Sequence, residues 1–359
     1  MDGSIAEAGN GWAPWRRRWR TLWATGIPRT VLGLAVTAVF GAVFVLRTDL
    51  GELKDSLGGV MLVWLAPAIA LNFIDVWFQA VRLRALLRHL SPPPNARLFA
   101  ALLVGIMGNN VLPMRMGMVL RAQYLSSRYN FRIASMLSVM AVEGFMDGIV
   151  LAALFIPILL IIGNETGIVW AVLVSGGVAL GGLLAIRLAY APRWSERLRP
   201  LAAALAAPFA RIPVPEGVAR QFAEWAGAFA EGVASVRSER SLFVAALATG
   251  AAWAVTAGVY YTVGLAFDLD VDWEAYLVLT AAINVSGLIQ VSQGNIGPYE
   301  VVAAEIMRSF GVASGPAAAY AIVTHLVRLI PLTIVGLGLF AWHVLISPPE
   351  PRGDAESPA

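Results

Sequence analysis

Long runs of apolar residues, separated by short polar stretches, make up most of this chain. A helix needs about 20 residues to cross the hydrocarbon core of a bilayer, and several of the runs reach that length. The pattern therefore predicts membrane-spanning helices. We expect six full spans, over residues 29–46, 57–80, 133–162, 168–188, 241–267 and 315–346.

Two further apolar segments, 97–130 and 275–311, are interrupted near their centres. Proline and glycine break helices, and apolar arms of about 15 residues are short for a full crossing. Each segment is predicted to be a broken or re-entrant helical hairpin, or two broken crossings, and either form returns the chain to the side it came from. The breaks contain candidate cavity-lining residues, namely Asn110, Pro113, Gly117, Gly294, Gly297 and Pro298.

Arginine is unevenly distributed between the two sides that this topology defines. The N-terminal run Trp15–Arg20 and the flanks of the first hairpin are rich in arginine, whereas the loops 49–55, 164–167 and 267–274 contain none. Cytoplasmic loops of membrane proteins carry the excess of basic residues. We therefore expect a multi-pass protein of the cell (inner or plasma) membrane, with both termini in the cytoplasm.

The same topology makes the two hairpins enter from opposite sides, so the halves 29–188 and 241–346 are predicted to be inverted copies. Many secondary transporters have this architecture. Glu143 follows Arg115 by 28 residues, and Arg328 follows Glu300 by the same 28 with the signs exchanged. We expect two half-sites, each joining the charges of one half. The predicted fold is an all-α polytopic membrane protein with two inverted-topology repeats.

The remaining segments are polar. Residues 1–28 are predicted to be a basic cytoplasmic N-terminus, and residues 347–359, rich in proline and charge, a disordered cytoplasmic tail. Residues 189–240 are predicted to be a cytoplasmic insert, in which Phe222, Trp225 and Phe229 recur at helical spacing. This spacing indicates an amphipathic helix that either lies on the membrane or only connects the halves.

Composition agrees with a membrane protein and narrows its chemistry. The chain is 58% hydrophobic and only 14% charged, with a mean hydropathy of +0.71, which excludes an ordinary soluble domain. It has no cysteine, and its three histidines are far apart, so we expect no disulfide, thiol chemistry, metal site or cofactor. A net charge of +3 suits anionic lipid and does not imply nucleic acid.

Charged residues inside apolar segments are costly and usually functional. The planar guanidinium of arginine suits phosphate, which makes the arginines of the breaks and spans candidate ligands. Glu143 and Asp147, four residues apart on one helix face, can share a proton or pair with an arginine. The candidate substrate-binding residues are Arg115, Arg121, Glu143, Asp147, Glu300, His325 and Arg328.

Each candidate also has a purely structural interpretation. Arg121 can be a cytoplasmic flank, and Glu143 can brace Arg115. Glu300 stands where a helix would begin and can cap it, and His325 can be a hydrogen-bonded core residue. The polar stripe Asn72, Asp75 and Gln79 either faces the cavity or locks helix to helix.

The motifs also carry a resemblance. The stretch Leu112–Gly117, followed by Arg121, resembles the L-P-x-R-x-G-E-x-x-R signature of the lysylphosphatidylglycerol synthase/flippase transmembrane family. Glu143 with Asp147 is similar to the family's E-R-x-x-D element, and Gly294–Glu300 resembles its P-G-G-x-G-x-x-E signature. The likeness covers residues 30–346. The chain departs from these motifs at Met118, Gly144, Gln293 and Asn295.

The resemblance implies the stand-alone flippase-like membrane part, without the soluble synthase domain and without lysyl transfer. We therefore expect a transporter, and no enzyme, that moves a phospholipid or a lipid-linked substrate of the polyprenyl-phosphate type by alternating access. The chain has no G-x-x-x-x-G-K-[ST] loop, so the energy would come from a coupling ion (a proton or Na⁺), the membrane potential or the substrate gradient. The alternatives are an intramembrane enzyme acting on a lipid phosphate, and a non-transporting partner of envelope-synthesis enzymes.

Overall fold

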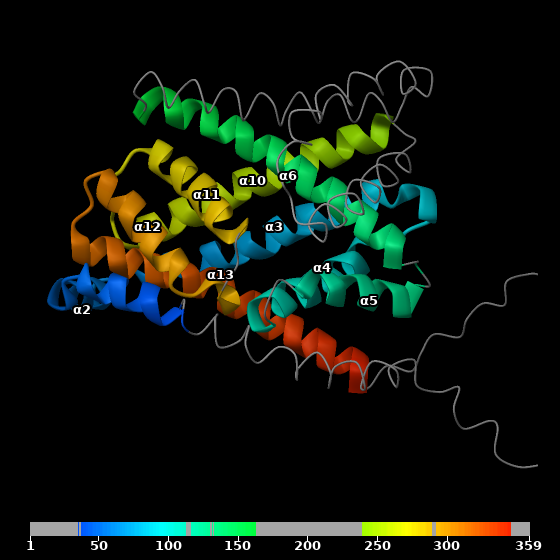
Figure 1. Cartoon of the computed structure of the whole chain (residues 1–359), viewed down its shortest axis with the longest axis horizontal. Helices are drawn as coiled ribbons and strands as arrows, with labels where there is room; N and C mark the ends of the chain where they lie inside the picture. Colours follow the sequence, from blue (N-terminus) through cyan, green and yellow to red (C-terminus); the bar gives the residue numbers. More distant parts are fainter. Residues whose placement is uncertain are drawn as a thin grey trace, which may run out of the picture.

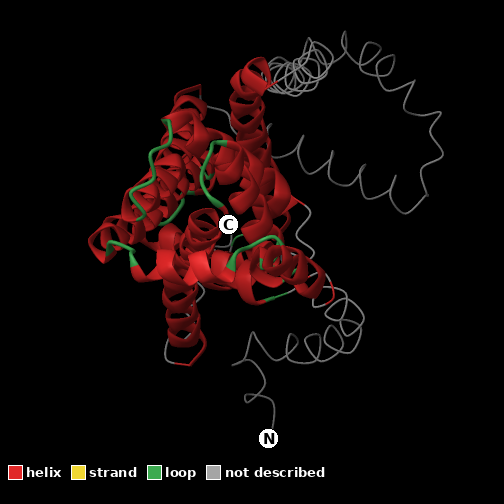
Figure 2. Cartoon of the chain, turned by 90° about the vertical axis from the view of Figure 1, so that its left-hand side faces the viewer, coloured by secondary structure: helices red, strands yellow, loops and turns green. Residues whose placement is uncertain are grey.

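The computed structural model describes residues 37–112, 116–129, 133–162, 239–288 and 292–345, together with positions 35 and 131. Regular structure within these ranges is entirely helical (Figure 2), as the apolar pattern predicts. The longer helices, shown in Figure 1, are α2 (Leu50–Gly58), α3 (Leu65–Leu86), α4 (Asn95–Val111), α5 (Gly117–Tyr129), α6 (Ile133–Ile162), α10 (Glu239–Ala266), α11 (Trp273–Leu288), α12 (Pro298–Ser309) and α13 (Ser314–Leu345).

Three helical segments are long and apolar enough to cross a membrane: Leu62–Leu86, Arg240–Ala266 and Ser314–His343. They correspond to the predicted spans 57–80, 241–267 and 315–346. Helix α6 has the bounds predicted for another span, and a shorter apolar helix, Thr37–Leu46, covers part of the predicted span 29–46.

Several predicted segments cannot be compared with the structure. Residues 1–34, 163–238 and 346–359 lie outside the described part of the chain, and with them the predicted N-terminal region, the span 168–188, nearly all of the insert 189–240, and the tail.

Both predicted helix breaks are present. The first separates α4 from α5, and the second separates α11 from α12. A Cβ on Gly117 would collide with the carbonyl oxygen of Gly105, so glycine lets α5 begin against α4. In the second break Gly294 and Gly297 have φ angles of 60° and 97°, which favour glycine, and Pro298 then starts α12.

The two hairpins extend from opposite ends of α13 (Figure 1). Near the end of α5, Arg128 contacts His343 at 2.7 Å, close to the last residue of α13. Near the end of α12, Arg308 and the first residue of α13, Ser314, both donate to the carbonyl oxygen of Arg47 at 3.0 Å. Because α13 has 32 residues, or about 48 Å at 1.5 Å per residue, the outer ends of the hairpins are far apart.

The inner ends of the hairpins meet beside the middle of α13. The backbone oxygen of Asn110 is 3.5 Å from the position that a Cβ would take on Gly294. The side chain of Asn110 donates to Thr333 Oγ1 at 2.8 Å, and Leu329 packs against Gly294. The two breaks therefore approach one another in the interior of the helical assembly.

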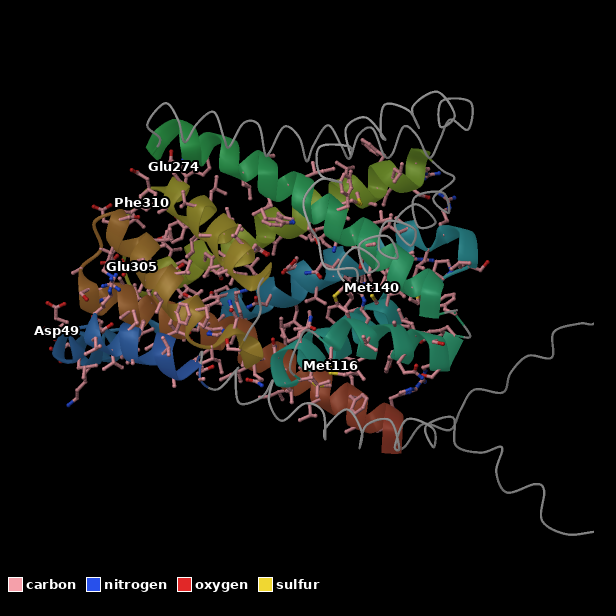
Figure 3. The ribbon with its side chains drawn as sticks, viewed as in Figure 1. Asp49, Met116, Met140, Glu274, Glu305 and Phe310 are labelled. Carbon is pink, nitrogen blue, oxygen red and sulfur yellow. The ribbon has the colours of Figure 1, made fainter. Side chains whose placement is uncertain are left out.

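Buried apolar residues form two main clusters that divide α3 and α13 between them. One cluster, on α4, α5 and α6, includes Val76 of α3 and Leu332 of α13. The other, on α10, α11 and α12, includes Ala68 of α3 and Val327 of α13. Figure 3 shows Asp49, Glu274, Glu305 and Phe310 at one end of the molecule. Asp49 and Glu274 belong to two of the three loops predicted to share a side, and these two lie together, while 164–167 is outside the described residues. The prediction of a loop over 49–55 is wrong, because helix α2 begins at Leu50, with Asp49 as its cap.

Candidate functional site

A cavity of about 420 Å³ lies among α3, α4, α5, α6, α10, α11 and α13. Its polar lining includes Gln79, Asn109, Thr256 and Asn284. Within the described residues, the charged lining consists of equal numbers of arginines and carboxylates, namely Arg82, Arg121, Arg328, Asp75, Glu143 and Asp147. Formal charges in the lining therefore balance.

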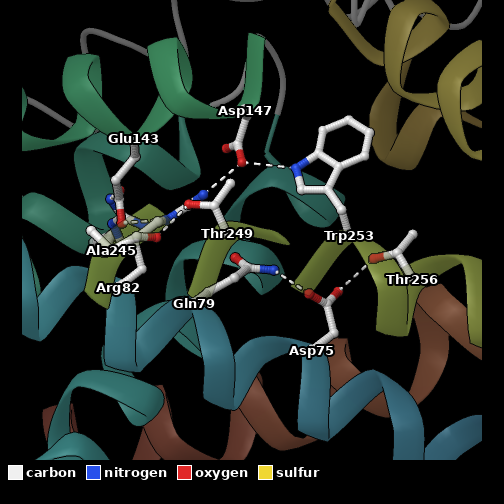
Figure 4. A network of polar contacts seen from close by, with 10 residues as sticks. Asp75, Gln79, Arg82, Glu143, Asp147, Ala245, Thr249, Trp253 and Thr256 are labelled. Atoms are coloured by element: carbon white, nitrogen blue, oxygen red, sulfur yellow. Dashed lines mark hydrogen bonds and ion pairs between the residues drawn. The ribbon is translucent and has the colours of Figure 1, made fainter. Parts of the chain in front are cut away.

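Arg82 connects three helices at one side of the cavity (Figure 4). Its side chain is 6% exposed, and its Nη1 donates to Asp147 Oδ1 at 2.5 Å. Its Nε lies 3.7 Å from Glu143 Oε1. The same Asp147 oxygen accepts a 3.0 Å hydrogen bond from the indole of Trp253 on α10. Asp147 thereby joins α6 to Arg82 of α3 and to Trp253 of α10.

Glu143 lies between two arginines. Its Oε2 accepts a hydrogen bond from Arg121 Nη2, while Oε1 faces Arg82. Gly105 on α4 makes room for this arrangement, because a Cβ there would stand 3.0 Å from Arg121 Cβ. Among the described groups, the Nε atoms of Arg82 and Arg121 make no hydrogen bond. These two atoms have almost no accessible surface, so they are unsatisfied donors of the described structure and not sites open to a ligand.

Asp75 and Arg328 stand at another part of the lining. Asp75 accepts hydrogen bonds from Gln79 at 3.0 Å and from Thr256 at 3.2 Å. Arg328 Nη2 is 4.0 Å from Asp75 Oδ2, and the guanidinium lies 5.3 Å from the ring centroid of Tyr260. Its Nη1 is buried and has no hydrogen-bond partner among the described groups. Arg328 is thus held more loosely by carboxylate than Arg82 or Arg121 is.

Glu300 and His325 are not lining residues of this cavity; they join each other beside the second break. His325 Nδ1 is 2.6 Å from Glu300 Oε1, and His325 Nε2 is 2.9 Å from the carbonyl oxygen of Gly294. The other Glu300 oxygen accepts from the backbone N–H of Gly297 at 2.7 Å. The predicted cap on α12 is therefore present. The ring of Tyr299 stacks on His325 with centroids 4.1 Å apart.

Four of the predicted substrate-binding residues line one cavity, namely Arg121, Glu143, Asp147 and Arg328. Of the break residues predicted to line it, Gly117 does so, whereas the prediction is wrong for Asn110, Gly294, Gly297 and Pro298, which lie at the breaks outside its lining. Arg115 and Pro113 lie outside the described residues, so the expected pair of Arg115 with Glu143 stays a prediction. The expected pair of Glu300 with Arg328 is wrong, because Glu300 pairs with His325 and Arg328 faces Asp75.

The arginine-rich flank that the sequence predicts to be cytoplasmic begins with Arg82, but the structure buries this side chain. The apolar run ends near residue 80, but α3 continues to Leu86 and carries Arg82 into the cavity. One signal was available, since Arg82 extends the stripe of Asn72, Asp75 and Gln79 along the same helix face. The stripe serves both of its expected roles: Asp75 and Gln79 line the cavity, while Asn72 donates to the carbonyl oxygen of Val327 at 3.2 Å.

The sequence of this chain is similar to those of known proteins. One relative, Glycosyltransferase AglD of Haloferax volcanii, is 28% identical over 334 residues, a match that covers 85% of this chain and 53% of the relative. The chain thus spans about half the length of that protein. Residues 30–336 match the family described as Lysylphosphatidylglycerol synthase TM region. That match covers most of the chain and both hairpins, and the protein therefore belongs to this family of membrane proteins.

Proposed function

We propose that this protein is a flippase that moves a phospholipid, or a lipid-linked phosphate of the polyprenyl type, between the leaflets of the cell membrane. The observation that carries the proposal is the charged cavity beside the meeting point of the two hairpins. Arginines there are balanced by carboxylates, and Arg328 is only loosely engaged. Buried charges are expensive in a membrane, and they mark substrate pathways more often than supports of the fold.

The arrangement suits a phosphate-bearing headgroup. Removing a carboxylate from a buried arginine leaves an uncompensated charge, so the empty cavity needs Asp75, Glu143 and Asp147. An arriving phosphate can bind Arg328, whose side chain is 25% exposed, and can replace a carboxylate as the partner of Arg82 or Arg121. A cavity of about 420 Å³ holds a headgroup, and the hydrocarbon chains would stay in the bilayer.

The hairpins supply the second part of the proposal. They reach inward from opposite ends of α13, as expected for two inverted repeats that give a central site alternate access to either side. We infer a multi-pass orientation with cytoplasmic termini, and transport driven by a proton or Na⁺ gradient, by the membrane potential or by the substrate gradient. Arg115 remains a proposed ligand of the same headgroup.

The test is lipid movement in liposomes that contain the purified protein. Fluorescent phospholipid and fluorescent polyprenyl phosphate are placed in the membrane, and a membrane-impermeant quencher measures the fraction that reaches the outer leaflet. Wild type should move at least one probe faster than protein-free liposomes do.

Arg328→Gln should slow that movement about tenfold or more, because the substitution removes a charged hydrogen bond to the headgroup. The matched control is Arg308→Gln on α12, because Arg308 bonds to the carbonyl oxygen of Arg47 and does not line the cavity. Equal rates for wild type and Arg328→Gln would contradict the proposal.

A second function is favoured by the name of the relative, which is a glycosyltransferase. In this alternative the chain binds a lipid phosphate for an enzymatic step, or partners envelope-synthesis enzymes, and transports nothing. Mass spectrometry of the lipids recovered from the same liposomes separates the cases. A chemically altered lipid indicates an intramembrane enzyme, whereas unmodified lipid that crosses the bilayer indicates a flippase.

A further inference from the structure

Two side chains close the break between α11 and α12. Glu300 holds the backbone N–H of Gly297 with one oxygen and His325 Nδ1 with the other, at 2.7 Å and 2.6 Å. His325 Nε2 then reaches the carbonyl oxygen of Gly294 at 2.9 Å. The pair, which we name the Glu300–His325 clasp, thus ties the two glycines of the break together. Both glycines adopt positive φ angles without strain but are conformationally free, so the segment depends on such contacts to keep its shape.

The geometry of the clasp indicates how many hydrogens its two side chains hold. A carbonyl oxygen only accepts, so His325 Nε2 must carry a hydrogen to bond Gly294. The contact between Nδ1 and Glu300 Oε1 also needs a hydrogen between the two atoms, because two bare acceptors at 2.6 Å repel each other. This second hydrogen can reside on the imidazole or on the carboxyl group. In either form the closed clasp holds one proton more than a neutral imidazole and a carboxylate together.

We propose that the Glu300–His325 clasp is a proton-binding site, and that release of its proton loosens the break between Gly294 and Gly297. On release the proton passes to water, and the neutral imidazole keeps one N–H, which can serve either Glu300 or Gly294 but not both. The other ring nitrogen then faces an oxygen with no hydrogen between them, and one of the two bonds that close the break is lost. Histidine is the side chain whose charge changes near neutral pH. The Glu300 side chain is 16% exposed, which gives the proton a route to the pair.

Among the described residues, tyrosine phenols are the ionisable groups beside the clasp. Tyr299 on α12 stacks on His325, and Tyr260 and Tyr320 lie near Tyr299; phenols titrate near pH 10 when unperturbed. The described residues of other elements that touch the break, together with Leu329 of α13, do not titrate; they are Thr37, Phe40, Asn110 and Ser286. Asp75 on α3 and Arg328, one turn along α13, face each other at 4.0 Å.

The position of Arg328 connects the clasp to the cavity. After proton release the clasp carries one negative charge, on Glu300 of α12, which contacts His325 three residues before Arg328 on α13. This charge attracts the guanidinium and competes with an anionic headgroup. Proton binding and headgroup binding should therefore strengthen each other, as linkage requires. This connection rests on the proposed function, whereas the proton site itself does not.

Substitution of Glu300 provides a sharp test. In Glu300→Gln the amide oxygen can accept from Gly297 N–H, and the amide NH₂ can donate to Nδ1 of a neutral His325. All bonds of the closed clasp are then satisfied without a proton that titrates near neutral pH. In His325→Gln a single amide nitrogen cannot serve both Glu300 and Gly294, so the clasp should stay open. Glu305→Gln is the matched control, because it removes a carboxylate of the same helix that pairs with Arg47, outside the clasp.

The experiment is amide hydrogen exchange of residues 293–300 in detergent, from about pH 5 to pH 9, corrected for the intrinsic rate at each pH. Wild type and Glu305→Gln should exchange at least tenfold faster at the upper end of this pH range than at the lower end. Glu300→Gln should stay protected throughout, and His325→Gln should exchange fast throughout.

A transition of wild-type size in Glu300→Gln, or none in wild type, would overturn the proposal. If His325→Gln fails to fold, the comparison of wild type with Glu300→Gln decides alone. The assay needs no transported lipid, so a protein that does not flip lipid can still confirm the proton site.

Discussion

Arg82 on α3 donates through Nη1 to Oδ1 of Asp147 on α6 across 2.5 Å, and this ion pair ties two helices of the first half together at the cavity wall. The sequence separation is 65 residues, so the pair constrains the fold over a long loop of chain. Because the partners are buried unequally, with side-chain exposures of 6% and 38%, water reaches the carboxylate side. This pair provides the first prediction.

Arg82→Gln should lower the thermal stability of the protein in detergent. The substitution leaves Glu143 and Asp147 facing each other without Arg82, and breaking a buried pair costs about 3–5 kcal/mol. Partial exposure of Asp147 places the expected loss at the lower end of that range. The double variant Arg82→Gln/Asp147→Asn should recover part of the loss. A melting temperature equal to that of wild type would show that the pair contributes nothing.

Arg121 and Glu143 should behave as a coupled pair in a double-mutant cycle. Each single change to Gln removes the same hydrogen bond, so the double variant should lose less stability than the sum of the two singles, with a coupling of about 0.5–3 kcal/mol. Arg308→Gln with Glu143→Gln is the control cycle, since Arg308 lies on α12 away from the cavity. Additive losses in both cycles would mean that the pair is not formed.

A short-chain phospholipid should raise the melting temperature of the protein by binding the folded state. The rise should be smaller in Arg328→Gln, because its free donor is gone. It should be larger in Glu143→Gln, because phosphate no longer competes with that carboxylate for the arginines. Titration of melting temperature against lipid concentration measures both effects. Equal rises in all three proteins would place the lipid outside the cavity.

The ends of the molecule should be accessible from opposite sides of the membrane. The chain has no cysteine, so a single introduced thiol can be labelled specifically. Asp270→Cys, in the acidic loop between α10 and α11, should react with an impermeant maleimide on intact cells. Arg88→Cys, just after α3, should react only after permeabilisation. Both positions are exposed in the structure. Labelling of both from one side would contradict the predicted topology.

Gly117→Ala should prevent normal packing of the first hairpin, since the added Cβ would collide with the carbonyl oxygen of Gly105. The backbone cannot yield as a flexible side chain would, so we expect loss of folded protein in size-exclusion chromatography. Gly250→Ala is the matched control. It meets nothing within 4 Å, and in a helix interior alanine is favoured over glycine by about 1 kcal/mol. Normal yield of Gly117→Ala would show that α4 and α5 are spaced more widely.

The helices and both breaks could be predicted from the sequence because they depend on local chemistry. Apolar run length sets the helices, and Gly117, Gly297 and Pro298 interrupt them whatever the packing. Positions in the cavity depend instead on how far a helix extends. Arg82 lies two residues beyond an apolar run, and only its helical phase with Asp75 hints that it is buried.

The partners of the charged residues were harder still to predict from the sequence. His325 and Arg328 are three residues apart on α13, and neighbours at this spacing share a face, so either can be matched to Glu300 on paper. The packing of α12 against α13 places Glu300 beside His325, and the packing of α3 places Asp75 beside Arg328. Crossing angles arise from packing of whole helices, which no single motif encodes.

Pro331 interrupts the backbone hydrogen bonds of α13 where the two apolar clusters adjoin. Proline has no N–H, so the carbonyl oxygen of Val327 loses its partner within the helix, and Asn72 of α3 supplies the missing bond. Residues of α13 before this point pack with α10 to α12, and those after it pack with α4 and α5. The longest helix in the described part of the chain thus consists of two arms, each packed with a different group of helices. If these two groups of helices rotated relative to each other, α13 would bend at Pro331, where one helical hydrogen bond is already missing. The free-energy cost of the bend would depend largely on the hydrogen bond that Asn72 of α3 donates to Val327.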